Sequence, residues 1–189
     1  MPVTRIGWVL GSGGARALRA GAAALAAVAA LGAIPATVAS ASPRALDWAK
    51  QSPAVHPPAR AGGAMAYDAA TGTVVLFGGL HHGHFLGDTW TWDGTTWTKH
   101  HPAASPSARA DPAMTYDAAT GTTVLFGGFV SDTWTWDGTT WAKQHPAASP
   151  HARQFPSMAY DAATGTVVLF GGNVAGHPRR TLGDTWTWG

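Results

Sequence analysis

One phrase occurs three times in this chain, and its spacing limits the folds that the chain can adopt. The copies read AMAYDAATGTVVLFGG, AMTYDAATGTTVLFGG and SMAYDAATGTVVLFGG, over residues 64–79, 113–128 and 157–172. Each copy leads, after an insert of variable length, into the letters DTWTW. The period is 49 residues from Tyr67 to Tyr116 and 44 from Tyr116 to Tyr160. Periods of this size indicate repeated supersecondary units that stack on one another.

Each unit divides into four short strands. AMAY and TVVLF are joined by DAATG, in which Asp bonds nearby backbone amides and Gly can take a positive φ. DTWTW follows the double glycine, and DGT is a tight hairpin signal before the polar segment TWTKH. The composition agrees, because Gly (24), Pro (13) and Trp (10) are abundant and Glu, a good helix former, is absent. The fold class is therefore predicted to be all-β.

The apolar strand, the double glycine and the spaced aromatic pair resemble the kelch repeat. The residues that carry the resemblance are Gly78, Gly79, Gly127, Gly128, Gly171, Gly172, Tyr67, Tyr116, Tyr160, Trp97 and Trp141. The resemblance implies blades of a β-propeller. Some secreted kelch propellers are galactose-oxidase-like enzymes with a copper centre that uses a Tyr linked to a Cys. This chain has no Cys, so that chemistry is not carried over.

The third unit lacks its outer strand, and a matching segment precedes the first unit. DWAKQSPAVHPPAR (47–60) aligns with TWAKQHPAASPHAR (140–153), which places Trp48 against Trp141. We therefore expect a segment over 42–189 that consists of a leading outer strand and three blades. The expected ranges are 47–51 for that strand, 64–101 for blade 1, 113–145 for blade 2 and 157–188 for blade 3, which lacks its outer strand.

Three blades are fewer than the four to eight that usually close a propeller. One hypothesis is self-association of two chains into a six-bladed ring, with strand 47–51 of each chain completing the third blade of its partner. The alternatives are a truncated product and a structural fragment of a larger propeller.

Residues 1–41 have the pattern of a secretory signal peptide. Arg5, Arg16 and Arg19 precede an uncharged, Ala-rich apolar stretch that ends in Ala39-Ser40-Ala41. We expect cleavage after Ala41 and secretion; the alternative is an uncleaved membrane anchor. Nine of the 12 Lys and Arg then remain against ten Asp, so the charge gives no support for a nucleic-acid partner. We expect no membrane association after cleavage.

The copies differ mainly between the double glycine and DTW, in what we call the b–c connections. They read LHHGHFLG in unit 1, FVS in unit 2 and NVAGHPRRTLG in unit 3. Since function usually sits on variable loops of a regular scaffold, we expect a ligand site on this face. His81, His82 and His84 are candidate ligands of Zn or Cu, with a solvated, flexible loop as the alternative. The corresponding candidates in unit 3 are His177, Arg179 and Arg180, for an anionic or sugar ligand.

An arginine precedes the first strand of every unit, at Arg60, Arg109 and Arg153. These arginines either form part of a ring suited to acidic groups or pair locally with Asp88, Asp132 and Asp184. No catalytic residues are predicted. The leading interpretation is a secreted, non-catalytic binding module for an extracellular glycan or protein. The rival is a metal-dependent hydrolase or oxidase that uses the three histidines of unit 1.

Overall fold

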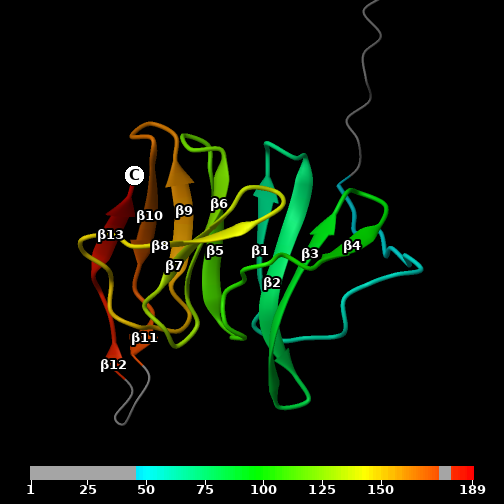
Figure 1. The fold of residues 1–189 in the computed structure, drawn as a ribbon, viewed down its shortest axis with the longest axis horizontal. Coiled ribbons are helices and arrows are strands. Elements are labelled where there is room, and N and C mark those ends of the chain that lie inside the picture. Colours follow the sequence, from blue (N-terminus) through cyan, green and yellow to red (C-terminus); the bar gives the residue numbers. More distant parts are fainter. Residues whose placement is uncertain (1–45, 175–179) are drawn as a thin grey trace, which may run out of the picture. The chain divides into compact units, whose positions relative to one another are not determined.

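The computed structural model describes residues 46–174 and 180–189 (Figure 1). The expected signal peptide over 1–41, its cleavage site and the alternative anchor lie outside these residues. All the strands lie within the compact unit Ala49–Gly189. The expected outer strand at 47–51 is not a strand in the single chain, and the Trp48 side chain is 99% exposed. Its expected partner is a second copy, so this pairing stays a prediction.

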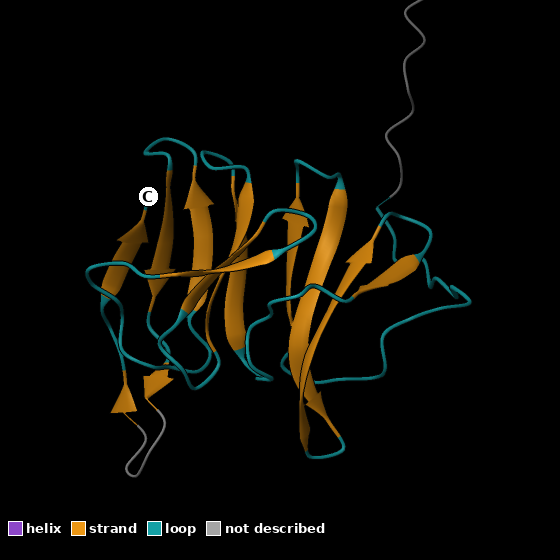
Figure 2. Ribbon diagram, viewed as in Figure 1, coloured by secondary structure: helices purple, strands orange, loops and turns teal. Residues whose placement is uncertain are grey.

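The prediction of an all-β fold built from four-stranded antiparallel sheets is confirmed (Figure 2). No helix occurs in the described residues, and hence none that could cross a membrane. Blade 1 consists of β1 (Ala64–Asp68), β2 (Thr73–His81), β3 (His84–Trp92) and β4 (Trp97–His100). Blade 2 consists of β5 (Pro112–Asp117), β6 (Thr122–Gly127), β7 (Thr133–Trp136) and β8 (Trp141–Gln144).

Blade 3 has three strands in the described chain. They are β9 (Ser157–Asp161), β10 (Thr166–Phe170) and β13 (Thr185–Trp188). The short ribbon of β11 (Asn173–Val174) and β12 (Arg180–Thr181) extends from the same end of the sheet as the long β2–β3 hairpin of blade 1 (Figure 1). β13 pairs with β10 on one side, and no other strand of the described residues lies along its second side.

The turn after the first strand of each blade is built by its aspartate. In blade 1 the Asp68 carboxylate accepts from the Ala70 amide at 3.0 Å, and the Gly72 amide donates to the Asp68 carbonyl at 2.9 Å. Gly72 has φ +70°, a conformation that favours glycine. The turns at Asp117 and Asp161 repeat these bonds. The letters DAATG thus fix each β-hairpin and its register.

The three sheets follow one another face to face, with β1 beside β5 and β5 beside β9. The interface of blades 1 and 2 holds the main apolar core. Its buried residues are Ala64, Val75, Phe77, Met114, Leu125, Trp134, Trp136 and Trp141. The double glycines tie neighbouring blades together, because the Gly79 amide donates to the Arg109 carbonyl at 2.8 Å and the Gly128 amide to the Arg153 carbonyl at 2.9 Å.

The outer faces of the first and third blades expose residues that are buried in the middle blade. Met65 of blade 1 is 53% exposed, whereas its counterpart Met114 is 8% exposed. Phe170 of blade 3 is 53% exposed, whereas its counterpart Phe126 is 3% exposed. Each terminal blade therefore presents the type of surface that packs against a neighbour elsewhere in the same molecule.

Candidate functional site

The b–c connection of blade 1 forms a paired hairpin where the sequence indicated a loop. β2 and β3 continue past Gly79, and His81 pairs with His84 across the turn residues His82 and Gly83. Both turn residues have positive φ, +47° and +82°, as a two-residue type I′ turn requires. The pattern His-Gly between Leu80 and Phe85 was a hairpin signal in the sequence. The side chains of this b–c connection are therefore carried by two paired strands.

The three histidines of this hairpin do not converge. The His81 ring bonds the backbone carbonyl of Ala59 and lies against the His82 ring, with 4.2 Å between centroids. His84 is exposed. Across the part of the chain that the structure describes, no three His, Cys, Asp or Glu residues are placed to hold a metal ion. The Zn or Cu hypothesis therefore stays a prediction without geometric support.

The candidates in unit 3 are only partly described. Arg180 lies exposed on β12, while His177 and Arg179 fall outside the described residues. A cavity beside this ribbon is lined by His151, Arg180 and Asp184 among others. The predicted anionic or sugar ligand at this position stays a prediction.

The repeated arginines form local ion pairs, as the second interpretation of the sequence expected. Arg60 contacts Asp88 at 2.7 Å, Arg109 contacts Asp132 at 2.6 Å, and Arg153 contacts Asp184 at 2.7 Å. Each guanidinium also donates to the carbonyl of the first glycine of its blade's pair, Gly78, Gly127 or Gly171. The three arginine side chains are almost fully buried. These contacts give the arginines a structural role and leave ligand binding by them without a supporting observation.

A tryptophan completes each of these clusters. The indole Nε1–H of Trp90, Trp134 or Trp186 donates to the aspartate of its own blade at 2.7 to 2.9 Å. At Asp88 burial raises the pKa, but the hydrogen bonds from Arg60 and Trp90 and the charge of Arg60 outweigh it and hold the pKa below its ordinary value. The Arg–Asp–Trp cluster is thus a charged element that the scaffold repeats in each blade.

Two exposed aromatic residues that were not predicted as site residues lie together at the b–c end of the blades. Phe85 of the blade 1 hairpin and Phe129 of the blade 2 connection lie with their rings 5.7 Å apart. Both are exposed, as is Leu80 on the same hairpin. The signal was present in the sequence, since Phe85 and Phe129 stand in the variable inserts, where the scaffold needs no aromatic ring.

One further position at this end has an unusual backbone in every blade. Gly62, Asp111 and Phe155 each lie two residues after the repeated arginine, and all three have positive φ. The Asp111 amide donates to the Gly62 carbonyl at 2.8 Å, and the Phe155 amide donates to the Asp111 carbonyl at 3.0 Å. Phe155 is exposed. Burial raises the pKa of Asp111, although Gln154 donates to its carboxylate. The positive φ is strained for Asp111 and Phe155 but not for Gly62, and the residue at this position differs in each blade.

Among the described residues, one hydroxyl lies within bonding distance of a histidine ring, that of Thr91 at 2.8 Å from His100, and no carboxylate is bonded to a histidine. The histidine ring bonds found there go to the backbone carbonyls of Pro57 and Ala59 and to the hydroxyl of Thr91. No serine hydroxyl is bonded to a histidine among them. The geometry offers apolar rings with polar neighbours, which suits recognition.

Comparison with protein-family models and with curated proteins found no match to this chain.

Proposed function

We propose that the protein is a secreted, non-catalytic binding module of the kelch type, whose b–c face holds an extracellular glycan or protein. The observation that carries the proposal is the exposed pair of Phe85 and Phe129 on two neighbouring blades. The kelch resemblance supports the proposed family, and the signal-peptide pattern supports the proposed secretion.

The surroundings of the pair support recognition more than catalysis. Two apolar rings at the surface cost free energy unless a partner covers them, and single aromatic anchors dominate many interfaces. His82 and His84 stand exposed at the tip of the same hairpin and offer hydrogen bonds at the rim. The hairpin is held by its own strand pairing, so little ordering is needed on binding.

A glycan array and an affinity column test the proposal with matched variants. The double variant Phe85→Ser/Phe129→Ser removes both rings, and Val55→Ser removes an exposed apolar side chain elsewhere on the surface. We expect the wild type and Val55→Ser to bind the same glycan, or to retain the same secreted protein, and the double variant to bind at least about tenfold more weakly. Binding that is unchanged in the double variant, or no binding in either assay, would contradict the proposal.

A further inference from the structure

The interface between blades 1 and 2 is closed by a single side chain of an outer strand. Trp141 begins β8 of blade 2 and reaches across to blade 1. Its ring lies 5.4 Å from Phe77 and 5.3 Å from Trp136, between centroids, and its Nε1–H donates to the Thr89 hydroxyl at 2.8 Å. Trp141 is buried, so this indole fills the space between two sheets and satisfies its one polar group.

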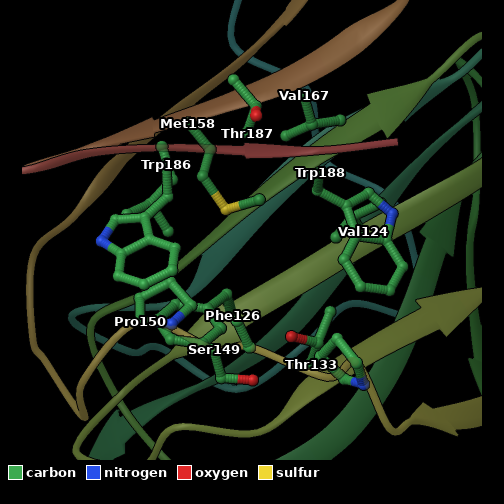
Figure 3. A pocket seen from close by; sticks show the side chains of 13 residues that line it. Val124, Phe126, Thr133, Ser149, Pro150, Met158, Val167, Trp186, Thr187 and Trp188 are labelled. Atoms are coloured by element: carbon green, nitrogen blue, oxygen red, sulfur yellow. The ribbon is translucent and has the colours of Figure 1, made fainter.

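The next interface has a cavity where the equivalent indole would lie. The repeat places Phe126, Thr133 and Trp188 at the positions of Phe77, Thr89 and Trp136. All three line a mainly apolar cavity between blades 2 and 3, together with Met158 and Trp186 (Figure 3). Blade 3 has no strand at the place of β8 in the described chain. The cavity is therefore the counterpart of the Trp141 site without its tryptophan.

The polar group of the cavity also lacks its partner. Thr89 accepts the indole N–H of Trp141, whereas no side-chain hydrogen bond of Thr133 is found within residues 46–174 and 180–189. Thr133 is a buried residue at the wall of the cavity. The Thr133 hydroxyl at the wall of the cavity can accept a hydrogen bond, so the site suits a ring that carries one N–H donor.

We propose that Trp48 of a second copy of this chain fills the cavity, with residues 47–51 of that copy paired to β13 as the outer strand of blade 3. The proposal concerns assembly and does not depend on the ligand of the b–c face.

The sequence identifies the occupant. DWAKQ at 47–51 matches TWAKQ at 140–144, and Trp48 stands 12 residues before Arg60, as Trp141 stands 12 before Arg153. Arg60 and Arg153 make the same contacts in their own blades. Trp141 lies on the outer strand of blade 2, the blade that precedes blade 3. By the same spacing, residues 47–51 with Trp48 form the outer strand of the blade that precedes blade 1. In the single chain its indole is exposed.

The order of the blades makes a second copy the source. Blade 1 packs on blade 2 and blade 2 on blade 3, with no contact between strands of blades 1 and 3. The blade that precedes blade 1 must lie on its face opposite to blade 2. Blade 3 lies beyond blade 2, so the described residues do not supply the blade in question, and we assign it to a second copy.

The docking would continue an interface that the chain already forms twice. Blade 3 exposes Phe170 and Thr185, the counterparts of Phe77 and Thr89. Blade 1 presents Trp97, the counterpart of Trp141, beside a groove that Met65 also lines. In the assembly Trp97 of one copy would pack on Phe170 of the other and donate to Thr185. Two copies give six blades, within the usual range for a closed ring.

The register of the new strand pair follows from blade 2. There Trp136 lies opposite Trp141, and Thr135 lies opposite Ala142. The same register places Thr187 opposite Ala49, and Lys50 then points to the other side of the sheet.

Cysteine cross-linking tests this register, because the chain contains no Cys. Ala49→Cys and Thr187→Cys are placed in separate chains that carry tags of different size, mixed and oxidised. We expect a mixed dimer on a non-reducing gel, in at least about tenfold greater yield than with Lys50→Cys in place of Ala49→Cys, since opposite residues have Cβ atoms within disulfide reach. Equal yields, or no mixed dimer, would overturn the proposal. A double variant Ala49→Cys/Thr187→Cys that oxidises only within one chain would overturn it too, in favour of the chain's own segment.

The same cross-linking assay tests whether the Trp48 indole is needed for the two copies to associate. Trp48→Ala, added to the Ala49→Cys chain, is expected to lower the yield of mixed dimer by at least about tenfold. Leu46→Ala, two residues away and equally exposed, is expected to leave it unchanged. Trp48 is exposed in the single chain, so this variant should fold normally, which circular dichroism checks. An unchanged yield with Trp48→Ala would overturn the assignment of the cavity to this side chain.

Discussion

Two interfaces between the same kinds of sheet differ in this molecule by one side chain. Between blades 1 and 2, Trp141 packs on Phe77 and bonds Thr89. Between blades 2 and 3, Phe126 and Thr133 stand in the equivalent places and line a cavity. The sheets, turns and ion pairs are otherwise repeated. The comparison shows that the outer strand contributes mainly an indole that locks two blades together, and that its absence leaves the rest of the blade able to form.

The largest expected effect comes from emptying the filled interface. Trp141→Ala would leave between blades 1 and 2 the cavity that already exists between blades 2 and 3. We expect the free energy of unfolding to fall by about 4 kcal/mol, as for other buried aromatic truncations. Urea denaturation measures this. In the Trp48→Ala chain, which is expected to be monomeric, Trp97→Ala lies at the same position of blade 1 but is only half-buried, and it should cost less than half as much as Trp141→Ala. Equal losses would show that the interface does not depend on this indole.

The next effect concerns the Arg–Asp ion pair that occurs in every blade. Arg109→Ala leaves the Asp132 carboxylate unpaired, and we expect a loss of about 3 kcal/mol, at the lower end for broken buried pairs. The expected loss is at the lower end of the range because the Asp132 side chain is 20% exposed, so water can partly solvate its charge. In blade 3 the Asp184 side chain is 36% exposed, so Arg153→Ala should cost less. Thermal unfolding of both variants ranks them, and the reverse ranking would contradict the role given to burial.

A smaller effect is expected from removing the hydrogen bond that the Trp141 indole donates to Thr89. Thr89→Val removes the acceptor of Trp141 and leaves a buried N–H unpaired, for an expected loss of about 2 kcal/mol. Thr133→Val changes the same residue type at the open interface, where no indole is bonded. We expect the monomeric chain to tolerate Thr133→Val nearly unchanged. If both substitutions destabilise the chain equally in urea, the two interfaces do not differ as described.

The smallest effect is a pH dependence at His100. Its ring contacts Trp136 across the filled interface, with centroids 5.4 Å apart. Burial, and then the charge of His101, lowers its pKa below the ordinary value. A histidine pKa that is lower in the folded state contributes stability in full above the unfolded pKa, near 6.5, and loses it as the pH falls through that value toward the folded one. Gln144 holds the same place in blade 2 and does not titrate. NMR titration should give His100 a midpoint below about 6.5, the ordinary histidine value, and a higher midpoint would contradict this account.

The scaffold was predictable because every local signal was repeated. The letters DAATG, the double glycine and DGT mark the turns of the four-stranded antiparallel sheets β1–β4 and β5–β8. The pairing of Arg109 with Asp132 was foreseen because a residue that recurs in every unit usually serves the scaffold.

The candidate site was less predictable because its features depend on contacts between blades. Phe85 and Phe129 each stand in a variable insert, but the contact between their rings joins two units, so no pattern within one unit predicts it. The hairpin at His82 and Gly83 was not predicted because His-Gly is a weaker turn signal than Asn-Gly or Asp-Gly. The bond from Trp141 to Thr89 spans 52 residues, and no local pattern marks it.

The most direct test of the account is the molar mass of the unmodified protein in solution, measured by light scattering after gel filtration. If the cavity between blades 2 and 3 is the site of Trp48 from a second copy, the mass is that of two chains, and Trp48→Ala shifts it toward one. A stable, soluble particle with the mass of one chain at every concentration would contradict the account.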